Sequence, residues 1–183
     1  MGSLPPFPDD GVLPAGDYVL NLDELRSSPL VLGWQRQWPD AAVEWDAAWG
    51  QMLVENLAIL VNHLWQAGIV DIFIDGSFVE NKPHPNDIDG YFVCDQDAWF
   101  SGELLTRLQN LDPIWNWERR LRLPGSPKRQ LAMWHKYRVE LFPHFGQGTG
   151  ILDRFGYELE FPSAFRQSRE FQPKGIVKIG GKP

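Results

Sequence analysis

Apolar residues recur at steps of three and four positions between residues 40 and 67, and this spacing predicts one long amphipathic helix. Gly68 follows directly, in the position where a glycine commonly ends a helix. We therefore expect the helix to end at about residue 67. Its apolar positions are Val43, Trp45, Trp49, Met52, Leu53, Leu57, Leu60, Val61 and Leu64.

Shorter hydrophobic patterns follow along the rest of the chain. Residues 69–74 and 88–94 are rich in β-branched and aromatic residues and predict two strands, separated by the turn-rich stretch NKPHPND. Residues 97–112 carry apolar positions at helical spacing and predict a second helix that ends before a proline. Residues 137–142 and the segment GIVKI at 175–179 predict two further strands.

The chain length fits one domain with extensions at both ends. A chain of 183 residues and 21.0 kDa can bury one sizeable core, whereas two domains would each be small. Residues 1–39 are rich in Pro and Gly and hold only a short apolar run at residues 18–22. We therefore expect an N-terminal arm over residues 1–39, packed on a domain of residues 40–183 that includes a C-terminal tail.

Composition excludes several classes of protein. The most apolar stretch, residues 52–61, is interrupted by Glu55 and Asn56, so we expect no membrane span. The first residues lack the basic and apolar regions of a signal peptide, which favours a cytoplasmic protein. Cys94 is the single cysteine, and this excludes an internal disulfide framework and a cysteine-based zinc site.

The charge is distributed unevenly around a net value of −7. Residues 1–75 hold eleven acidic and two basic side chains, whereas residues 114–139 hold seven basic side chains and one acidic one. The basic segment 119–138 is either a solvated surface or a contact for an acidic acceptor such as tRNA. Most of the nine tryptophans should lie in the core, although Trp115 and Trp117, beside the basic segment, are candidates for stacking on a base.

The residues that indicate chemistry lie between the first two predicted strands. Gly76 and Ser77 end the first strand, nine residues follow, and Asp87-Ile88-Asp89 leads into the second strand. Asp87 and Asp89 are two residues apart on an extended chain, so both carboxylates leave the same face and can converge on a hard cation. The sequence therefore predicts a site for Mg²⁺ or Mn²⁺, ions that proteins commonly bind through one or two carboxylates together with substrate phosphates.

Other polar residues complete this predicted site. Gly76 lets the backbone approach a phosphate closely, and Ser77 offers a hydroxyl and an amide to its oxygens. Glu140, between apolar neighbours in the predicted strand 137–142, is the candidate for a third carboxylate at the metals. Lys82, in the loop, and Arg138, expected on the same strand face as Glu140, are candidates for neutralising phosphate charge.

This pattern resembles the signature of the DNA polymerase beta-type nucleotidyltransferase superfamily. The shared features are Gly-Ser, a spacer of about ten residues, Asp-x-Asp and a later single acid. The resemblance implies an α+β fold (an α/β mixed sheet), with a small mixed sheet backed by helices. It also implies that Gly76 and Ser77 bind the triphosphate and that the three acids hold the metals. These three acids are Asp87, Asp89 and Glu140.

The whole chain is also similar to a group of short bacterial nucleotidyltransferase-like proteins. The shared features are a Leu-Pro-rich arm, here residues 13–16, and a final Lys-Gly-Ile-Val segment, here residues 174–177. Two positions depart from the superfamily pattern. Glu140 replaces the commoner Asp, and Gly90 stands where an apolar residue usually follows the Asp pair, which suggests a bulge or a close backbone approach.

The predicted function is transfer of a nucleoside monophosphate from a nucleoside triphosphate to an acceptor hydroxyl, dependent on Mg²⁺ or Mn²⁺. Small members of this superfamily resemble antibiotic-modifying enzymes, tRNA-modifying toxins of toxin–antitoxin pairs and protein-adenylylating regulators. The chain is short for a separate acceptor domain, which favours RNA or a protein as acceptor, or a partner protein that supplies the missing surface. Two alternatives stay open: a non-catalytic nucleotide-binding sensor or interaction module, and metal-dependent hydrolysis of a phosphoester.

Overall fold

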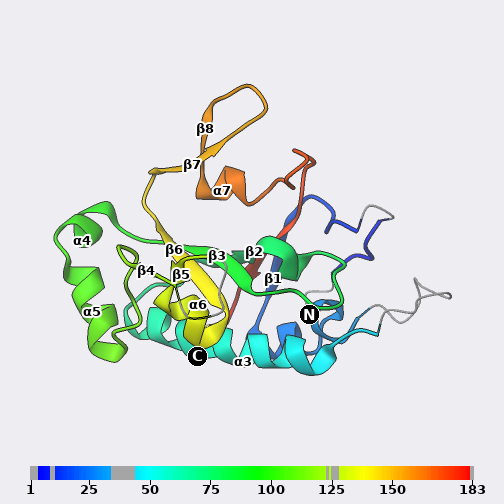
Figure 1. Ribbon diagram of the computed structural model, residues 1–183, viewed down its shortest axis with the longest axis horizontal. Helices are drawn as coiled ribbons and strands as arrows, with labels where there is room; N and C mark the ends of the chain where they lie inside the picture. The colour runs from blue at the N-terminus through cyan, green and yellow to red at the C-terminus, as the bar shows by residue number, and fades with distance from the viewer. Residues whose placement is uncertain (1–3, 9–10, 34–43, 123, 125–127, 182–183) are drawn as a thin grey trace.

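The computed structural model describes residues 4–8, 11–33, 44–122, 124 and 128–181. The chain has the expected α+β fold, in which helices back a five-stranded mixed sheet (Figure 1). The strands lie in the order β1 (Asp17–Leu20), β9 (Ile176–Ile179), β2 (Ile72–Asp75), β3 (Ile88–Val93) and β6 (Val139–His144). Strands β1 and β9 pair in parallel, as do β3 and β6, whereas β2 is antiparallel to its two neighbours.

The two faces of this sheet differ because successive side chains of a strand point to opposite sides. One face is apolar and belongs to the main core, to which Ile72, Ile74, Ile88 and Phe92 contribute fully buried side chains. Helix α3 (Ala47–Gln66) runs along the sheet and contributes leucines to the same core (Figure 1). The opposite face carries the residues that alternate with the apolar ones, and the candidate acids belong to it.

Helix α3 begins later than the hydrophobic spacing suggested. Asp46 caps it, because its carboxylate accepts a hydrogen bond from the backbone N–H of Trp49 at 3.0 Å. The expected start at residues 40–43 and the expected boundary after residue 39 lie outside the described residues. The end agrees with the sequence, since the helix ends at Gln66 and Gly68 has a φ of 86°.

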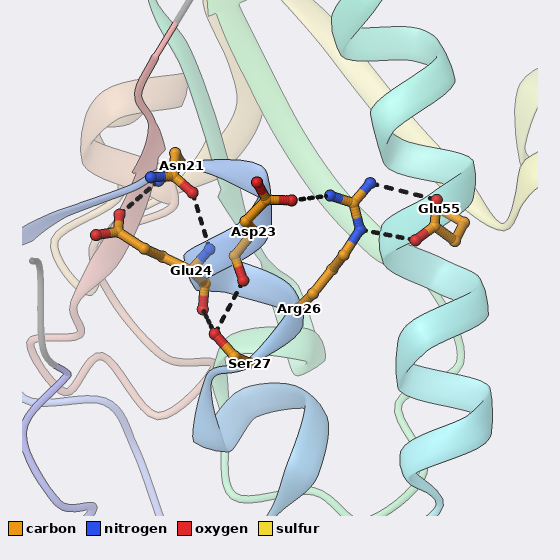
Figure 2. A network of polar contacts seen from close by, with 6 residues as sticks. All are labelled: Asn21, Asp23, Glu24, Arg26, Ser27 and Glu55. Atoms are coloured by element: carbon orange, nitrogen blue, oxygen red, sulfur yellow. Dashed lines mark hydrogen bonds and ion pairs between the residues drawn. The ribbon is translucent and has the colours of Figure 1, made fainter.

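The segment expected as an extended arm contributes regular structure to the domain. It forms strand β1 and the short helices α1 (Leu22–Arg26) and α2 (Pro29–Leu32). Asn21 and Glu24 form a reciprocal capping box at the start of α1, and Arg26 forms an ion pair with Glu55 of α3 (Figure 2). Residues 17–32 therefore extend the sheet and pack against α3, which the Pro and Gly content of the region had obscured.

The predicted helix over residues 97–112 is divided into α4 (Gln96–Phe100) and α5 (Glu103–Leu111). Gly102 lies between them with a φ of 76°, a left-handed conformation that interrupts a helix. The predicted strand 137–142 is shifted, because residues 132–137 form α6 (Ala132–Tyr137) and β6 begins at Val139. Strand β6 contains Pro143, which fits the edge of a sheet, where one side needs no backbone N–H.

The C-terminal third of the chain covers the second face of the sheet and then returns to its centre. The hairpin of β7 (Gly148–Leu152) and β8 (Glu158–Glu160) projects from the body, and α7 (Phe161–Ala164) follows it (Figure 1). The predicted strand GIVKI forms β9, which lies between β1 and β2. Over the described ranges, no helix is both long and apolar enough to cross a membrane.

Candidate functional site

Three acids lie side by side on the face of the sheet opposite the main core. Asp89 of β3 is paired in register with Asp75 of the antiparallel strand β2 and with Glu140 of the parallel strand β6. Directly paired residues of neighbouring strands project from the same face, at a strand spacing of about 4.8 Å. We call Asp75, Asp89 and Glu140 the carboxylate row. Asp89 is its central member, so it has a like charge on either side.

Sequence reasoning identified two members of the carboxylate row and missed the third. It named Asp89 and Glu140 as site residues and treated Asp75 only as the end of a strand. Asp75 is 2% exposed, and burial raises its pKa to about 7 although the nearby Lys174 ammonium opposes this shift. The available signal was its position immediately before Gly76 at the end of a buried strand, since an acid is uncommon in such surroundings.

The two outer acids of the row have basic or N–H partners. Lys174 Nζ lies 3.0 Å from Asp75 Oδ1. Glu140 is 6% exposed, and its Oε1 accepts a hydrogen bond from the backbone N–H of Leu131 at 3.0 Å. Arg120 Nη1 lies 3.6 Å from the same oxygen, close enough for an ion pair. Both ends of the row are therefore compensated by other parts of the chain.

The central acid has no such compensation. Asp89 forms no ion pair with any residue that the structure describes. Burial and the negative charges of Asp87, Glu140 and Asp75 together raise its pKa to about 7, although the charge of Lys174 opposes this shift. A cation bound at Asp89 would relieve both effects, because it would replace the missing positive charge.

Asp87 lies just before β3 and is held by a residue that the sequence did not single out. Its Oδ2 accepts a hydrogen bond from the indole Nε1 of Trp134 on α6 at 2.6 Å. The guanidinium of Arg138 lies over the Trp134 ring, 3.9 Å from its centroid. Arg138 was expected on the strand face beside Glu140, but it caps α6 with a φ of 55° and precedes β6. Its side chain therefore supports the indole that binds Asp87.

The Gly76-Ser77 turn lies directly against the central acid. Gly76 begins the 3₁₀ turn η1 (Gly76–Val79) with a φ of 72°, and a Cβ atom there would lie 2.5 Å from Asp89 Oδ2. Only glycine fits this combination of left-handed backbone and close contact. The half-buried Ser77 makes no side-chain hydrogen bond within the described part of the chain. No side-chain partner within these residues therefore competes with a ligand for its hydroxyl.

Gly90 follows Asp89 for a reason of packing. The pairing of β2 with β3 continues regularly through Ile74 and Gly90, so no bulge is present there. A Cβ atom on Gly90 would collide with the carbonyl oxygen of Phe73 and with the side chain of Leu141. Of the two explanations that the sequence suggested, the structure shows the close backbone approach.

The loop between the Gly76-Ser77 turn and Asp87 is fastened to the start of α3. The indole of Trp49 donates a hydrogen bond to the carbonyl of Pro85 at 2.6 Å and stacks on His84, whose Nδ1 lies 2.9 Å from Asp46 Oδ2. Lys82, the candidate phosphate contact, is half-buried in this loop and forms no ion pair with the described residues. The loop that delivers Asp87 is thus anchored at two adjacent residues.

The basic segment 119–138 reaches the site through a small hairpin. Strands β4 (Arg120–Leu121) and β5 (Gln130–Leu131) form it and supply both the Arg120 and the Leu131 contacts to Glu140. The exposed Arg119 and Arg129 flank this hairpin. Base stacking does not fit Trp115, which is fully buried, while the indole of Trp117 donates a hydrogen bond to the carbonyl of Leu141.

The donor chemistry of Asp87 and Asp89 fits a hard divalent cation. Carboxylate oxygens are suitable ligands, and Mg²⁺ needs only one or two of them when substrate phosphates complete its coordination. Across the described ranges, no group of three or more His, Cys, Asp or Glu side chains is arranged to hold a metal ion. This agrees with the contacts of Asp87 with Trp134 and of Glu140 with Leu131, which direct two carboxylates to protein groups.

Comparison with known proteins identifies the family of the chain but no activity. The chain belongs to a family described as a family of unknown function (DUF6932), whose sequence profile matches residues 5–180. No curated protein and no solved structure matches the chain. The match covers nearly the whole sequence, including the segment expected as an arm and the C-terminal strand.

Proposed function

We propose that this member of the family is a nucleotidyltransferase that depends on Mg²⁺ or Mn²⁺. The observation that carries the proposal is the uncompensated Asp89 at the centre of the carboxylate row, with the Gly76-Ser77 turn against it and Asp87 two residues before it. The resemblance to the polymerase beta-type signature supports the same function. The site would accept a nucleoside triphosphate and an acceptor hydroxyl, and it would operate in the cytoplasm.

The proposed reaction is a single displacement at the α-phosphorus. The acceptor hydroxyl oxygen forms a bond to phosphorus, the bond to the pyrophosphate oxygen breaks, and the hydroxyl proton passes to a base or to solvent. Asp87 and Asp89 would hold the divalent cation, which supplies neutralisation of phosphate charge when bound. Ser77 would contact the phosphates, and Lys82 would add positive charge from the loop.

Glu140 has a more specific role in this proposal than that of a third metal ligand. Its carboxylate is oriented by the Leu131 N–H and by Arg120, both on the β4–β5 hairpin. It would therefore connect the acceptor-facing hairpin to Asp89 and assist the acceptor hydroxyl from the side of β6. The basic segment 119–138 would bind RNA, or a protein acceptor or partner, through side chains such as Arg119 and Arg129.

Transfer of label tests the proposal. The purified protein is incubated with each α-³²P-labelled nucleoside triphosphate, Mg²⁺ or Mn²⁺, and total cellular RNA or protein. We expect incorporation into one acceptor class by the wild type and at least a ~100-fold loss in Asp87→Asn and Asp89→Asn, because these positions carry the charge that the reaction needs. Asp97→Asn, an exposed acid on α4, is the matched control and should retain the activity.

Failure of this experiment has a defined meaning. Absence of label in every acceptor, with folded protein, would refute the transferase proposal. Release of a labelled product without incorporation would instead indicate hydrolysis of a phosphoester, the third of the functions that the sequence left open.

One observation favours a second candidate function, a non-catalytic nucleotide-binding module. Two carboxylates expected at the metals are engaged by protein donors, Asp87 by Trp134 and Glu140 by Leu131. A module of this kind would bind a nucleoside triphosphate with Mn²⁺ and transfer nothing. Equilibrium binding of ATP that survives in Glu140→Gln, together with absence of label transfer by the wild type, would favour it.

A further inference from the structure

A buried lysine from the C-terminal segment lies next to the carboxylate row and has no part in the proposed chemistry. Lys174 precedes β9 and is 3% exposed, the most buried of the lysines and arginines within the described residues. It reaches residues almost a hundred positions earlier in the chain. Its ammonium lies on the side of Asp75 and Gly76, next to Asp89 but forming no ion pair with it.

Three oxygens surround the Lys174 ammonium. Nζ donates hydrogen bonds to the carbonyl oxygen of Gly76 at 2.9 Å and to Glu80 Oε1 at 2.8 Å. Asp75 Oδ1 lies 3.0 Å away as an ion-pair partner, although its orientation makes no hydrogen bond. An ammonium has three N–H donors, and removing it from water is costly unless such partners are present. The ammonium therefore has a fixed place.

The contact with Gly76 has a consequence for the neighbouring peptide group. In a trans peptide the C=O and the following N–H point in opposite directions, and no cis peptide is present in the described chain. By holding the Gly76 carbonyl, Lys174 directs the N–H of Ser77 away from itself. Gly76 could otherwise adopt several backbone conformations, because glycine lacks the restriction of a Cβ atom.

We propose that Lys174 is a positioning residue for the triphosphate. It fixes the Gly76–Ser77 peptide in the one orientation that presents the amide and hydroxyl of Ser77 beside Asp89. This inference rests on the proposed function, because it assigns Ser77 to the phosphates. It also gives the C-terminal segment a role at the site, since the residue that sets the turn arrives from the far end of the chain.

A second lysine of the C-terminal segment forms an ion pair that does not involve the Gly76-Ser77 turn. Lys178 of β9 is 35% exposed and lies 2.6 Å from Asp71 Oδ1. Within the described chain it forms no hydrogen bond with the Gly76-Ser77 turn or with the carboxylate row. Lys178→Met is therefore a matched control, because it removes one lysine–aspartate pair from the same C-terminal segment and leaves the turn intact.

The experiment separates the effect of the hydrogen bond that Lys174 donates to Gly76 from the effect of its positive charge. All variants carry Asp75→Asn, which removes the need to compensate a buried carboxylate. Lys174→Met then removes the Lys174 donor from the Gly76 carbonyl and leaves it only the Val79 N–H of the 3₁₀ turn, whereas Lys174→Gln keeps a neutral donor. Three quantities are measured: hydrogen exchange of the Val79 amide, binding of Mn²⁺ alone, and binding of ATP with saturating Mn²⁺.

The expected results distinguish positioning from folding. Relative to Asp75→Asn, the variant with both Asp75→Asn and Lys174→Met should bind ATP about tenfold or more weakly, the scale of a lost charge-assisted hydrogen bond. It should exchange the Val79 amide about tenfold faster, because the Gly76 carbonyl that accepts this amide is no longer held by Lys174. Its affinity for Mn²⁺ alone should change less than about threefold, since the Asp87 and Asp89 ligands are untouched. Lys174→Gln should recover part of both losses, and Lys178→Met in the same background should match Asp75→Asn.

Two outcomes can be told apart. If Lys174→Met and Lys174→Gln in the Asp75→Asn background bind ATP and exchange the Val79 amide as Asp75→Asn does, the positioning role of Lys174 is wrong, whatever the fate of the transferase proposal. If the wild type does not bind ATP while Lys174→Met still accelerates Val79 exchange, the proposed function fails and the control of the turn by Lys174 stands. If Lys174→Met is too unstable to fold, Lys174→Gln still tests the proposal: positioning predicts a smaller loss in the same direction, and values equal to those of Asp75→Asn would refute it.

Discussion

Two ion-pair networks in this molecule have similar distances and very different surroundings. On the surface, Arg26 of α1 contacts Asp23 at 2.6 Å and Glu55 of α3 at 2.7 Å (Figure 2). Beside the carboxylate row, Lys174 lies 2.8 Å from Glu80 and 3.0 Å from Asp75. The side chains of Asp23 and Glu55 are 92% and 61% exposed, whereas those of Lys174 and Asp75 are both 3% exposed.

The difference shows that burial, rather than distance, decides what an ion pair does. Exposed charges are already solvated, so pairing them changes the free energy of unfolding little. Buried charges have lost their water and depend on each other, so breaking one pair leaves the other charge without compensation. The surface network joins two helices, while the buried network holds Gly76 beside Asp89. Four substitutions test this contrast.

The largest effect is expected from Lys174→Met alone. It leaves Asp75 buried without its cation, so the free energy of unfolding should fall by about 3–5 kcal/mol, the usual cost of removing one partner of a buried pair. Urea unfolding at pH 7.5 followed by circular dichroism measures it. Addition of Asp75→Asn should restore most of the loss, because the uncompensated charge is then removed. A loss below about 1 kcal/mol in the single variant would contradict the contrast between the networks.

The hydrophobic pattern of the sequence was enough to predict several elements that form the core of the fold. The strand GIVKI, the strand after the turn-rich loop and the end of α3 at Gln66 follow from spacing and from a glycine stop. The helix break at Gly102 did not, since it depends on the left-handed backbone of that glycine rather than on apolar spacing. The replacement of an expected arm by β1, α1 and α2 did not either, since it depends on a packing partner far along the chain. Strand β1 exists because β9 provides an edge for it.

The candidate site divides in the same way. Asp87, Asp89 and the Gly76-Ser77 turn lie within one short stretch, so the local pattern was enough to suggest them. The contacts of Trp134 and Lys174 could not be suggested so, because each reaches the site from a segment at least 47 positions away. Lys174 had been noticed only as part of a terminal Lys-Gly-Ile-Val segment, and its burial was the missing information.

The second substitution, Gly76→Ala, tests the turn that the buried network holds. The new methyl group would sit on a left-handed backbone and collide with Asp89, so the free energy of unfolding should fall by about 2–3 kcal/mol. Gly68→Ala is the matched control, because Gly68 also has a positive φ but nothing lies within 4 Å of the added Cβ; it should lose only ~1 kcal/mol. Equal losses, measured by urea unfolding, would mean that the contact with Asp89 has no energetic weight.

The third substitution, Asp89→Asn, tests the uncompensated acid through pH. The pKa of Asp89 is raised to about 7 in the folded protein from a normal value near 4, so the folded state binds the extra proton more tightly. The stabilisation that protonated Asp89 gives to the folded state is complete below pH 4 and is lost as the pH rises to about 7. Asp89→Asn should therefore match the wild type at pH 4. At pH 8 its free energy of unfolding should be higher by at least ~1 kcal/mol, since one pKa unit corresponds to ~1.4 kcal/mol.

Divalent cations should reverse this difference. At pH 8 the deprotonated Asp87 and Asp89 would bind Mn²⁺ in the folded state only, so millimolar Mn²⁺ should raise the melting temperature of the wild type more than that of Asp89→Asn. Thermal unfolding with and without Mn²⁺ gives the comparison. If the free energy of unfolding depends on pH identically in the wild type and in Asp89→Asn, Asp89 is solvated and compensated.

The smallest effect is expected from Arg26→Gln in the exposed network. Arg26 donates three hydrogen bonds to Glu55 and Asp23 (Figure 2), and the substitution removes them. Asp23 and Glu55 then become solvated, so the free energy of unfolding should fall by less than ~1 kcal/mol. In 1 M NaCl even this loss should shrink, because the Debye length falls to about 3 Å and exposed charges are screened. The loss in Lys174→Met should persist at the same salt concentration, since ions do not enter its buried surroundings. Urea unfolding of both variants at low and high salt therefore separates the networks by mechanism, and a salt-sensitive Lys174→Met would show that its pair is accessible to solvent.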